Sequence, residues 1–260
     1  MTATISSEVA ISAPTSGEAA LVFDHVTKVF PDGTHAVGDA TLSVNPGEFV
    51  SIIGPSGCGK STLLKMASGL TSISGGRLAV DTNNIGYVFQ DATLLPWRTV
   101  KRNVELFAEL HGVPKSERAT IVQECIDLVG LTGFEGHYPR SLSGGMKMRC
   151  SLARSLTLKP GVFLFDEPFG AIDEITRDRL NTELMLLFGS ERFAGLFITH
   201  SISEAVYLST RVLVMSARPG RIIASFDIPF EYPRTEDLRY TAEFAALTGA
   251  INHALRDAHA

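Results

Sequence analysis

The amino-terminal part of the chain contains short apolar runs separated by turn residues. Residues 21–23, 40–44 and 49–53 are mostly apolar and contain several β-branched or aromatic side chains. Pro31-Asp32-Gly33 and Asn45-Pro46-Gly47 interrupt these runs with residues that favour turns. This pattern predicts a small β subdomain at this end of the chain.

The central part of the chain changes to a helical pattern. Between residues 100 and 131, apolar side chains recur every three or four positions, for example at Val104 and Phe107 and again at Val122 and Ile126. We expect helices here. Because they interrupt the strand pattern, they should form an inserted helical lobe.

Nearly continuous apolar runs follow at residues 162–165, 196–198 and 211–215. Strands without polar alternation are typical of parallel sheets that are covered on both faces. A helix is expected at about residues 174–188, and the order strand, helix, strand implies a right-handed crossover between parallel strands. The predicted fold class is therefore α/β with a mostly parallel core sheet.

The last segment of the chain has one apolar helical face. Tyr240, Phe244, Leu247, Ile251 and Leu255 share this face. We expect it to pack on the body of the protein rather than to bind a partner.

Composition narrows the classes of function. The 260 residues carry a formal net charge of −5, which disfavours a protein that coats nucleic acid through clustered Lys and Arg. No apolar run approaches the roughly 18 to 20 residues that span a bilayer. Three cysteines without metal-ligand spacing suit reduced thiols in a cytoplasm. Residues 1–18 lack the features of a secretory signal and are expected to be a flexible tail before a single domain at 19–260.

A phosphate-loop pattern directly follows the expected strand at residues 49–53. Its residues are Gly54, Pro55, Ser56, Gly57, Cys58, Gly59, Lys60, Ser61 and Thr62. Between a strand and a helix, the pattern G-x-x-x-x-G-K-[ST] lets backbone N–H groups and the helix N-terminus hold phosphate oxygens. Lys60 supplies a charge to the β- and γ-phosphates, and Ser61 a ligand for Mg²⁺. A plain glycine-rich turn is the alternative, and Cys58 is either a small packing residue or an oxidation sensor.

Two adjacent carboxylates, Asp166 and Glu167, follow the apolar run at residues 162–165. Side chains alternate along a strand, so the two carboxylates point in different directions. Asp166 is expected to assist Mg²⁺, and Glu167 to orient and deprotonate an attacking water. Taken alone, such a pair is often only a solvated strand end.

The segment Leu142-Ser143-Gly144-Gly145, followed by a basic helical stretch, resembles the signature of ABC transporter ATPases. The resemblance covers residues 21–200 and is to the import branch that serves nitrate, sulfonate, taurine and bicarbonate. It implies a P-loop NTPase fold with an N-terminal antiparallel β subdomain, a helical subdomain at about 91–157 and a C-terminal extension at about 219–260. It also implies an ATP hydrolase that uses ATP and Mg²⁺.

The resemblance assigns further roles at the nucleotide. Phe30 would stack on adenine, Gln90 would be a Mg²⁺ ligand beside Ser61 and Asp166, and His200 would sense the γ-phosphate. The catalytic set would be Glu167, His200 and Lys60. Purely structural alternatives remain open: Phe30 could pack in the core, Gln90 could be a surface polar residue and His200 could be a structural histidine.

In this family two copies face head to tail, so that the signature of one copy closes over the ATP of the other. The resemblance assigns this trans contact to Ser143, Gly144, Gly145 and Asp173. A Ser before two glycines at a helix start offers a hydroxyl, open N–H groups and a positive dipole end, although it can also be a simple helix cap. Met146, Met148 and Gly170 depart from the usual Gln, Gln and Ser, which leaves polar contacts across the interface at these positions open.

An apolar segment, Leu95-Pro96-Trp97, contains the only Trp of the chain. In the family this region receives a helix of the channel subunit, so the resemblance implies a coupling role, with core packing of Trp97 as the alternative. The implied partners are a second ATPase subunit, identical or paralogous, transmembrane permease subunits and, indirectly, a periplasmic or extracellular solute-binding protein, with no nucleic acid. The expected location is the cytoplasmic side of the bacterial inner membrane, as a peripheral subunit.

Two other functions compete with import. One is a soluble ABC ATPase that acts on ribosomes or nucleic acid, whose chains usually carry two cassettes or long coiled-coil insertions. The other is a small-molecule kinase that shares only the phosphate loop, which leaves the signature and His200 unexplained. The solute itself is not encoded in these features, because the binding protein and the channel select it.

Overall fold

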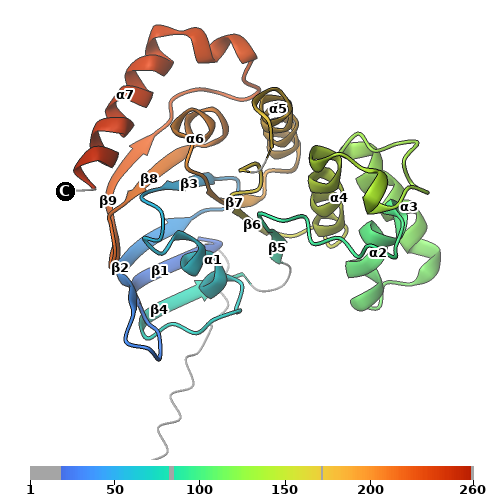
Figure 1. Cartoon of the computed structure of the whole chain (residues 1–260), viewed down its shortest axis with the longest axis horizontal. Helices are drawn as coiled ribbons and strands as arrows, with labels where there is room; N and C mark the ends of the chain where they lie inside the picture. The colour runs from blue at the N-terminus through green and yellow to red at the C-terminus, as the bar shows by residue number, and fades with distance from the viewer. Residues whose placement is uncertain (1–18, 82–84, 171, 259–260) are drawn as a thin grey trace, which may run out of the picture.

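The computed structural model describes residues 19–81, 85–170 and 172–258, so the tail expected at residues 1–18 lies outside the described residues. The described part comprises a curved sheet flanked by helices, with a separate helical lobe at the right of Figure 1. The phosphate-loop and signature sequences lie in different parts of the structure, because the first follows a strand of the sheet and the second begins a helix of the lobe.

Nine strands of the described chain form one sheet in the order β4-β1-β2-β9-β8-β3-β7-β6-β5. Their bounds are β1 Leu21–Val29, β2 His35–Val44, β3 Phe49–Ile53, β4 Gly75–Val80, β5 Ile85–Val88, β6 Val162–Asp166, β7 Ala194–Ile198, β8 Arg211–Met215 and β9 Gly220–Asp227. The strands from β8 to β5 are parallel neighbours, whereas β1 pairs antiparallel with β2 and β4. Strand β9 joins the two parts, because it runs antiparallel to β8 and parallel to β2. The predicted α/β class is confirmed.

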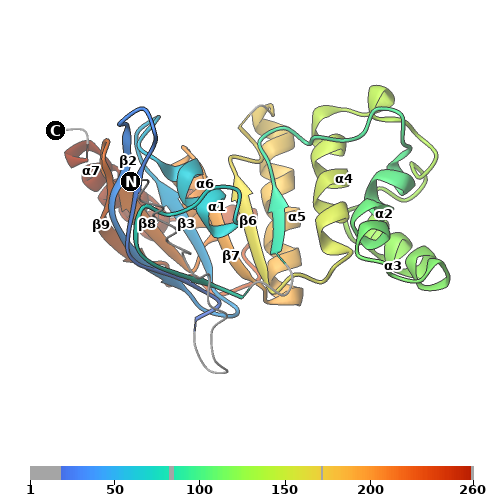
Figure 2. The same cartoon turned by 90° about the horizontal axis from the view of Figure 1, so that it is seen from below.

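The helices divide between the sheet and the lobe. Their bounds are α1 Lys60–Ala67, α2 Val100–Leu110, α3 Lys115–Leu128, η1 Pro139–Ser141, α4 Gly144–Leu156, α5 Glu174–Glu191, α6 Ile202–Leu208, η2 Glu236–Tyr240 and α7 Ala242–Asp257. The view from below shows α2, α3 and α4 packed together as the lobe, with α4 facing α5 of the core (Figure 2). Among the described helices, none is long and apolar enough to cross a membrane.

Alternation along the central strands divides the interior into two apolar cores. In β3, Phe49 and Ile53 join the core that lies under α5, α6 and α7, whereas Val50 and Ile52 join the core shared with α1 and the antiparallel strands. Strand β6 divides in the same way between its odd-numbered and even-numbered residues. Both faces are buried, which explains why the sequence shows continuous apolar runs here instead of alternation.

Phe49 lies at the centre of an aromatic cluster in the larger core. Its ring centroid lies 5.2 Å from that of Phe188, 5.7 Å from that of Phe197 and 5.8 Å from that of Phe165, and its side chain is fully buried. Edge and tilted contacts of this kind add to the free energy of area burial. Gly195 allows the close approach of β7, because a Cβ there would lie 2.7 Å from the Phe49 ring.

The carboxyl-terminal helix packs on the body of the protein, with one correction to the prediction. Phe244 and Ile251 of α7 are buried, and Leu247 and Leu255 are partly buried against the same core. Tyr240 is 87% exposed, because the chain forms η2 at that point and α7 begins only at Ala242. The apolar spacing therefore places the start of the helix too early, and Tyr240 is not part of its buried face.

Several elements have weak sequence signals. Strand β4 begins with two glycines, and β5 is four residues long and contains Gly86. A Cβ at Gly86 would lie 2.6 Å from the Phe163 ring, so the glycine that obscures the strand pattern permits the pairing with β6. Strand β9 alternates between exposed and half-buried positions, as expected for its place between the two parts of the sheet.

The three cysteines are buried and free. Burial raises the pKa of Cys125 to about 11 and that of Cys150 to about 12, so both remain thiols at neutral pH. Cys58 is 1% exposed within the apolar core beside α1, which supports its packing role over that of an oxidation sensor.

We predict that Phe49→Ala lowers the free energy of unfolding by about 3 to 5 kcal/mol, because it empties the centre of the aromatic cluster. Urea denaturation followed by circular dichroism measures this change. Tyr240→Ala is the matched control, since that ring is 87% exposed, and it should change stability by less than about 0.5 kcal/mol. Equal losses in the two variants would contradict the prediction.

Candidate functional site

The phosphate loop connects β3 to α1 in a conformation that requires glycine. Gly57 and Gly59 have φ values of 74° and 110°, in the left-handed region. A Cβ at Gly59 would lie 2.6 Å from the carbonyl oxygen of Ala36, and one at Gly54 would lie 2.7 Å from that of Met215. The glycines of the sequence pattern are therefore required both by backbone conformation and by the close approach of neighbouring strands.

Lys60 begins α1 and is 6% exposed. Its ammonium group donates hydrogen bonds to the carbonyl oxygens of Gly54 and Pro55, both at 2.8 Å. These bonds fold the lysine back over its own loop, where an ammonium with three N–H donors can also reach a phosphate oxygen. The structure thus places the Lys60 charge at the loop, as the sequence pattern predicts.

Ser61, in the first turn of α1, meets Asp166, the last residue of β6. The Ser61 hydroxyl donates to Asp166 Oδ1 at 2.7 Å, and the Tyr87 hydroxyl donates to Oδ2 at 3.4 Å. Burial, followed by the charge of Asp166, raises the pKa of Tyr87, so the phenol keeps its proton and acts as the donor. A hydroxyl and a carboxylate this close together form an all-oxygen pair of the kind that Mg²⁺ prefers.

This donor set fits a magnesium ion that takes some of its ligands from the protein and the others from a bound phosphate. The described residues contain no group of three or more His, Cys, Asp and Glu side chains that could form an all-protein metal cage. Mg²⁺ typically takes one or two protein ligands, together with phosphate oxygens and water. Ser61 and Asp166 supply such ligands, whereas the Gln90 side chain is exposed and makes no hydrogen bond within the described residues.

Glu167 leaves the end of β6 in an unusual backbone conformation. Its φ is 46°, and its N–H donates to the carbonyl oxygen of Ile198 at 3.0 Å. Its carboxylate Oε2 lies 3.4 Å from Nδ1 of His200, at the end of the neighbouring strand β7. The left-handed turn thus directs Glu167 toward His200, whereas Asp166 bonds to Ser61.

A small polar network holds the turn that carries His200. The Thr199 hydroxyl accepts from the N–H of Ser201 at 3.0 Å and donates to the carboxyl group of Glu204, so the bonded residues lie on both sides of His200. Burial raises the pKa of Glu204, and hydrogen bonds from Thr199 and Asn181 oppose this effect. Sequence reasoning missed Glu204, because a Glu in the first turn of a helix reads as an ordinary dipole-favoured position.

The phosphate loop borders a hollow of about 230 Å³. Its lining comprises Phe30, Thr34, Ala36, Ser56, Gly57, Gly59, Lys60, Ser61, Thr62, Glu167 and Arg218. Phe30 is half-buried at the end of the first strand, and the Lys28 ammonium lies 5.1 Å from the centroid of its ring. The structure brings most of the predicted nucleotide residues together here and adds Arg218, which no sequence pattern indicated.

The signature residues and Asp173 lie side by side, away from this hollow. Ser143 caps α4 by accepting from the N–H of Met146, and Asp173 caps α5 by accepting from the N–H of Thr176 at 3.0 Å. A Cβ at Gly145 would lie 2.8 Å from Thr176 Cγ2, so that glycine permits the two helix starts to touch. Ser143 and Gly144 are exposed, and none of these residues lines the hollow of the same chain.

The departures from the usual signature differ in their surroundings. Met148 is 5% exposed and belongs to the larger apolar core, so its side chain cannot face a partner. Met146 is partly buried against the same core. Gly170 has room for a side chain, because its nearest neighbours would lie 3.5 Å or more from a Cβ.

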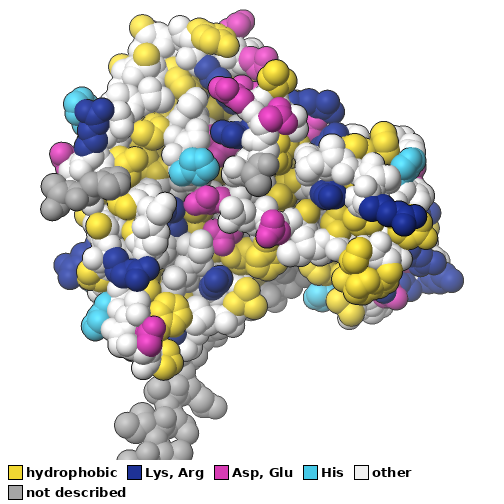
Figure 3. Space-filling model, viewed as in Figure 1, with side chains coloured by type: hydrophobic (Ala, Val, Ile, Leu, Met, Phe, Trp, Pro, Cys, Tyr) yellow, Lys and Arg dark blue, Asp and Glu magenta, His cyan; other side chains and the backbone are white. Residues whose placement is uncertain are grey.

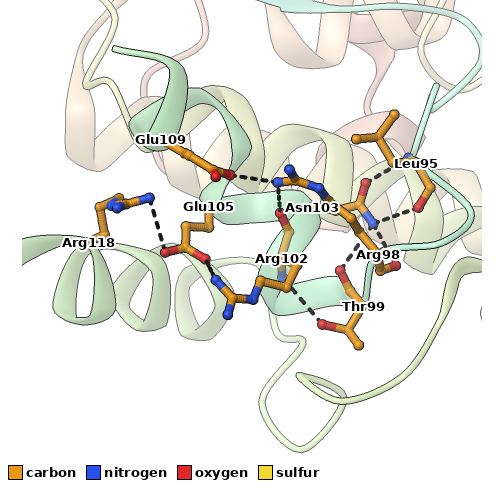
Figure 4. Close-up of polar contacts among 8 residues, drawn as sticks. All are labelled: Leu95, Arg98, Thr99, Arg102, Asn103, Glu105, Glu109 and Arg118. Carbon is orange, nitrogen blue, oxygen red and sulfur yellow. Dashed lines mark hydrogen bonds and ion pairs between the residues drawn. The ribbon is translucent and has the colours of Figure 1, made fainter. Parts of the chain in front are cut away.

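The segment expected to couple to a channel is a rigid loop that displays its tryptophan. Trp97 is 71% exposed, which rules out the core-packing alternative. Behind the loop, the fully buried Asn103 accepts from the N–H of Leu95 at 2.7 Å and donates to the carbonyl oxygens of Leu95, Arg98 and Thr99 (Figure 4). One side chain thus holds both ends of the loop.

Ion pairs surround this loop on α2 and α3. Arg98 pairs with Glu109 at 2.7 Å, and Glu105 pairs with Arg102 at 2.7 Å and with Arg118 at 3.5 Å (Figure 4). Glu105 is largely buried between its two arginines, so both of its carboxylate oxygens have a cation nearby. These contacts join the loop, through Arg98, and α3, through Arg118, to α2.

A family model described as ABC transporter matches residues 37–170, which is more than half of the chain and includes the phosphate loop, the signature and Asp166. The chain belongs to the ABC transporter family. A dimeric structure of a post-hydrolysis state of the ATP-binding cassette MJ0796, bound to ADP and phosphate, aligns with a TM-score of 0.71 and 28% identity. That match covers 81% of this chain and all of the other. This chain is thus an ABC-type ATPase, and ATP is its nucleotide.

Three relatives of this ABC ATPase are named for import. The taurine import ATP-binding protein TauB of Rhizobium johnstonii is 41% identical over 86% of this chain and 91% of its own length. The aliphatic sulfonates import ATP-binding protein SsuB of Bacillus cereus is 39% identical over 82% of this chain and 88% of its own length. The nitrate import ATP-binding protein NrtC of Synechococcus elongatus is 41% identical over 82% of this chain and 35% of its own length. The resemblance seen in the sequence is confirmed.

We predict that Glu204→Gln flattens the pH dependence of stability of this ABC ATPase. Because the folded-state pKa of Glu204 is raised, its contribution to stability is present below the ordinary value of 4.5 and is lost as pH rises toward the folded-state value. The amide does not titrate, so the unfolding free energy of the variant relative to wild type should increase with pH, by at most about 1.4 kcal/mol per pH unit. Urea denaturation between about pH 5 and 8 measures the two curves, and parallel curves would refute the assignment.

Proposed function

We propose that this chain is the ATP-hydrolysing subunit of a membrane importer for a small anion, of the kind represented by nitrate, sulfonates, taurine or bicarbonate. The observation that carries hydrolysis is that Lys60, Ser61 and Glu167 line one phosphate-loop hollow and that Asp166 bonds to Ser61 at its border. The names of three relatives, which import taurine, aliphatic sulfonates and nitrate, support the importer assignment. They favour import over a soluble ABC ATPase that acts on ribosomes or nucleic acid.

The residues in and beside the hollow have separate chemical roles in this proposal. The N–H groups of the phosphate loop and the Lys60 ammonium bind the β- and γ-phosphates, and Phe30 stacks on adenine. Ser61 and Asp166 hold Mg²⁺, with Gln90 as a third ligand once it turns inward. When bound, the ion neutralises charge on the phosphates.

Glu167 and His200 act on the far side of the γ-phosphate. Glu167 accepts a proton from the attacking water, and its distance of 3.4 Å from His200 Nδ1 suits two groups that share one reacting centre. His200 is 59% exposed, so its ring is accessible to a phosphate oxygen. The contact between Thr199 and Glu204 keeps the histidine turn in place while this happens.

A second ATPase subunit completes the site. Ser143, Gly144, Gly145 and Asp173 lie away from the hollow of their own chain, and the first two are exposed at a helix start. In a head-to-tail pair this helix start supplies a hydroxyl, N–H groups and a positive dipole end to the γ-phosphate of the partner's ATP. The dimeric form of the related cassette supports this arrangement.

The helical lobe connects the ATPase to its permease. Apolar side chains gather on the exposed surface of the lobe (Figure 3), and the coupling loop adds Trp97, which is 71% exposed. Leu95 and Pro96 complete the coupling loop that Asn103 holds. In this proposal the subunit is peripheral on the cytoplasmic face of the bacterial inner membrane, and a periplasmic or extracellular binding protein selects the solute.

We predict that Glu167→Gln retains ATP binding, loses turnover by about a hundredfold or more and accumulates as an ATP-bound dimer, because the amide cannot accept a proton. Phosphate release and size-exclusion chromatography with and without ATP measure the two effects. Lys60→Ala should instead bind ATP poorly and remain monomeric. Wild-type turnover in Glu167→Gln would remove the assignment of the base.

We predict that Trp97→Ala leaves basal ATP hydrolysis within about twofold of wild type but strongly reduces recovery of the permease, since an exposed indole held on a rigid loop is a typical interface anchor. The test is affinity purification of the tagged chain from mildly solubilised membranes of its native cell, followed by identification of the co-purified proteins.

Leu110→Ala is the matched control for this purification. Leu110 is also 71% exposed, but it is the last residue of α2, at the opposite end of that helix from the loop that carries Trp97. Recovery of a multispanning protein with wild type and Leu110→Ala, but not with Trp97→Ala, supports the importer and its docking site. Recovery of ribosomes or nucleic acid alone would overturn the importer assignment.

A further inference from the structure

The turn between β8 and β9 packs directly on the phosphate loop. A Cβ at Gly220 would lie 2.2 Å from the carbonyl oxygen of Cys58, and a Cβ at Gly54 would lie 2.7 Å from that of Met215. Strand β9 joins the two parts of the sheet, so the turn that precedes it lies where both parts meet the phosphate loop. The residues of this turn are thus positioned by the whole sheet.

Arg218 extends from this turn onto the phosphate loop. Its Nε and Nη2 atoms both donate to the carbonyl oxygen of Gly57, at 3.0 and 2.7 Å. In a planar trans peptide, the C=O and the following N–H point in opposite directions. Holding the carbonyls of Gly57 and Cys58 toward the turn therefore directs the next N–H groups, those of Cys58 and Gly59, away from it.

Much of the guanidinium remains available to a ligand. Arg218 is exposed and lines the same hollow as Lys60, Ser61 and Phe30. A guanidinium carries five N–H donors, and the two bonds to Gly57 use only its Nε side. Within the described residues, Arg218 forms no ion pair with an acidic side chain, so its positive charge is not neutralised by a close contact.

We propose that Arg218 is a second cationic residue of the nucleotide site, which binds the polyphosphate together with Lys60 and braces the loop through Gly57. A planar guanidinium suits phosphate oxygens, because it can present two parallel N–H donors. Its place beside the loop, rather than within it, explains why the phosphate-loop pattern does not include it. The inference rests on the assignment of this loop to the phosphates of ATP.

Binding of a non-hydrolysable ATP analogue, AMP-PNP with Mg²⁺, tests the proposal by calorimetry on the full chain. Arg218→Ala should weaken binding about tenfold, which corresponds to the loss of a hydrogen-bonded charge. The affinity of the variant should also fall less steeply with added salt, because one cation facing the phosphates is gone. Arg218→Gln, which keeps an N–H donor for Gly57 but has no charge, should show the same shallower salt dependence.

Arg221→Ala is the matched control, because Arg221 is an exposed arginine near the same turn that does not line the hollow. It should change the affinity by less than about twofold. Unchanged affinity in both Arg218 variants, or weaker binding with the salt dependence of wild type, overturns the proposal, since the second result leaves only a bracing role. Lys60→Ala, measured in parallel, separates failures: if it also binds normally, the phosphate-loop assignment itself is wrong.

Discussion

Strict alternation along the buried strand β6 decides the chemistry of the nucleotide site. Because both faces of β6 are buried, its even-numbered residues face α1, and Asp166 consequently meets Ser61 at the start of that helix. The next residue, Glu167, leaves the strand with φ 46° and turns toward His200. Two adjacent carboxylates thus enter different environments, and a shift of one residue in strand register would exchange them.

Sequence reasoning located the segments whose pattern is contiguous along the chain. The phosphate loop, the Asp166-Glu167 pair and the signature each lie at the boundary of one element. The glycines of the phosphate loop and Gly145 of the signature are required by backbone conformation or close packing. Long apolar runs identified the buried parallel strands for the same reason, since burial on both faces leaves a pattern that does not depend on distant partners.

Residues that act on distant backbone groups were not predictable. Arg218 and Arg154 donate to backbone carbonyl oxygens of other segments, and any sequence can supply a carbonyl. Such residues leave no pattern in their own neighbourhood, because their partners are defined by the tertiary fold alone. The prediction for Tyr240 was wrong for a related reason, since helical spacing does not reveal that the chain forms a 3₁₀ turn before α7 begins.

The contact between lobe and core determines how freely the signature can move relative to the phosphate loop. Where α4 meets α5, the facing side chains are largely apolar, with Met148, Leu180 and Leu184 around one small cavity, and a single ion pair of 3.8 Å joins Arg149 to Glu183. Apolar contact is non-directional, so a small rotation of the lobe costs less than it would across a network of hydrogen bonds. The coupling loop, in contrast, must rotate together with α2, because Asn103 holds both of its ends. In the proposed head-to-tail dimer, closure over ATP at the signature would therefore move Trp97 as part of a rigid body.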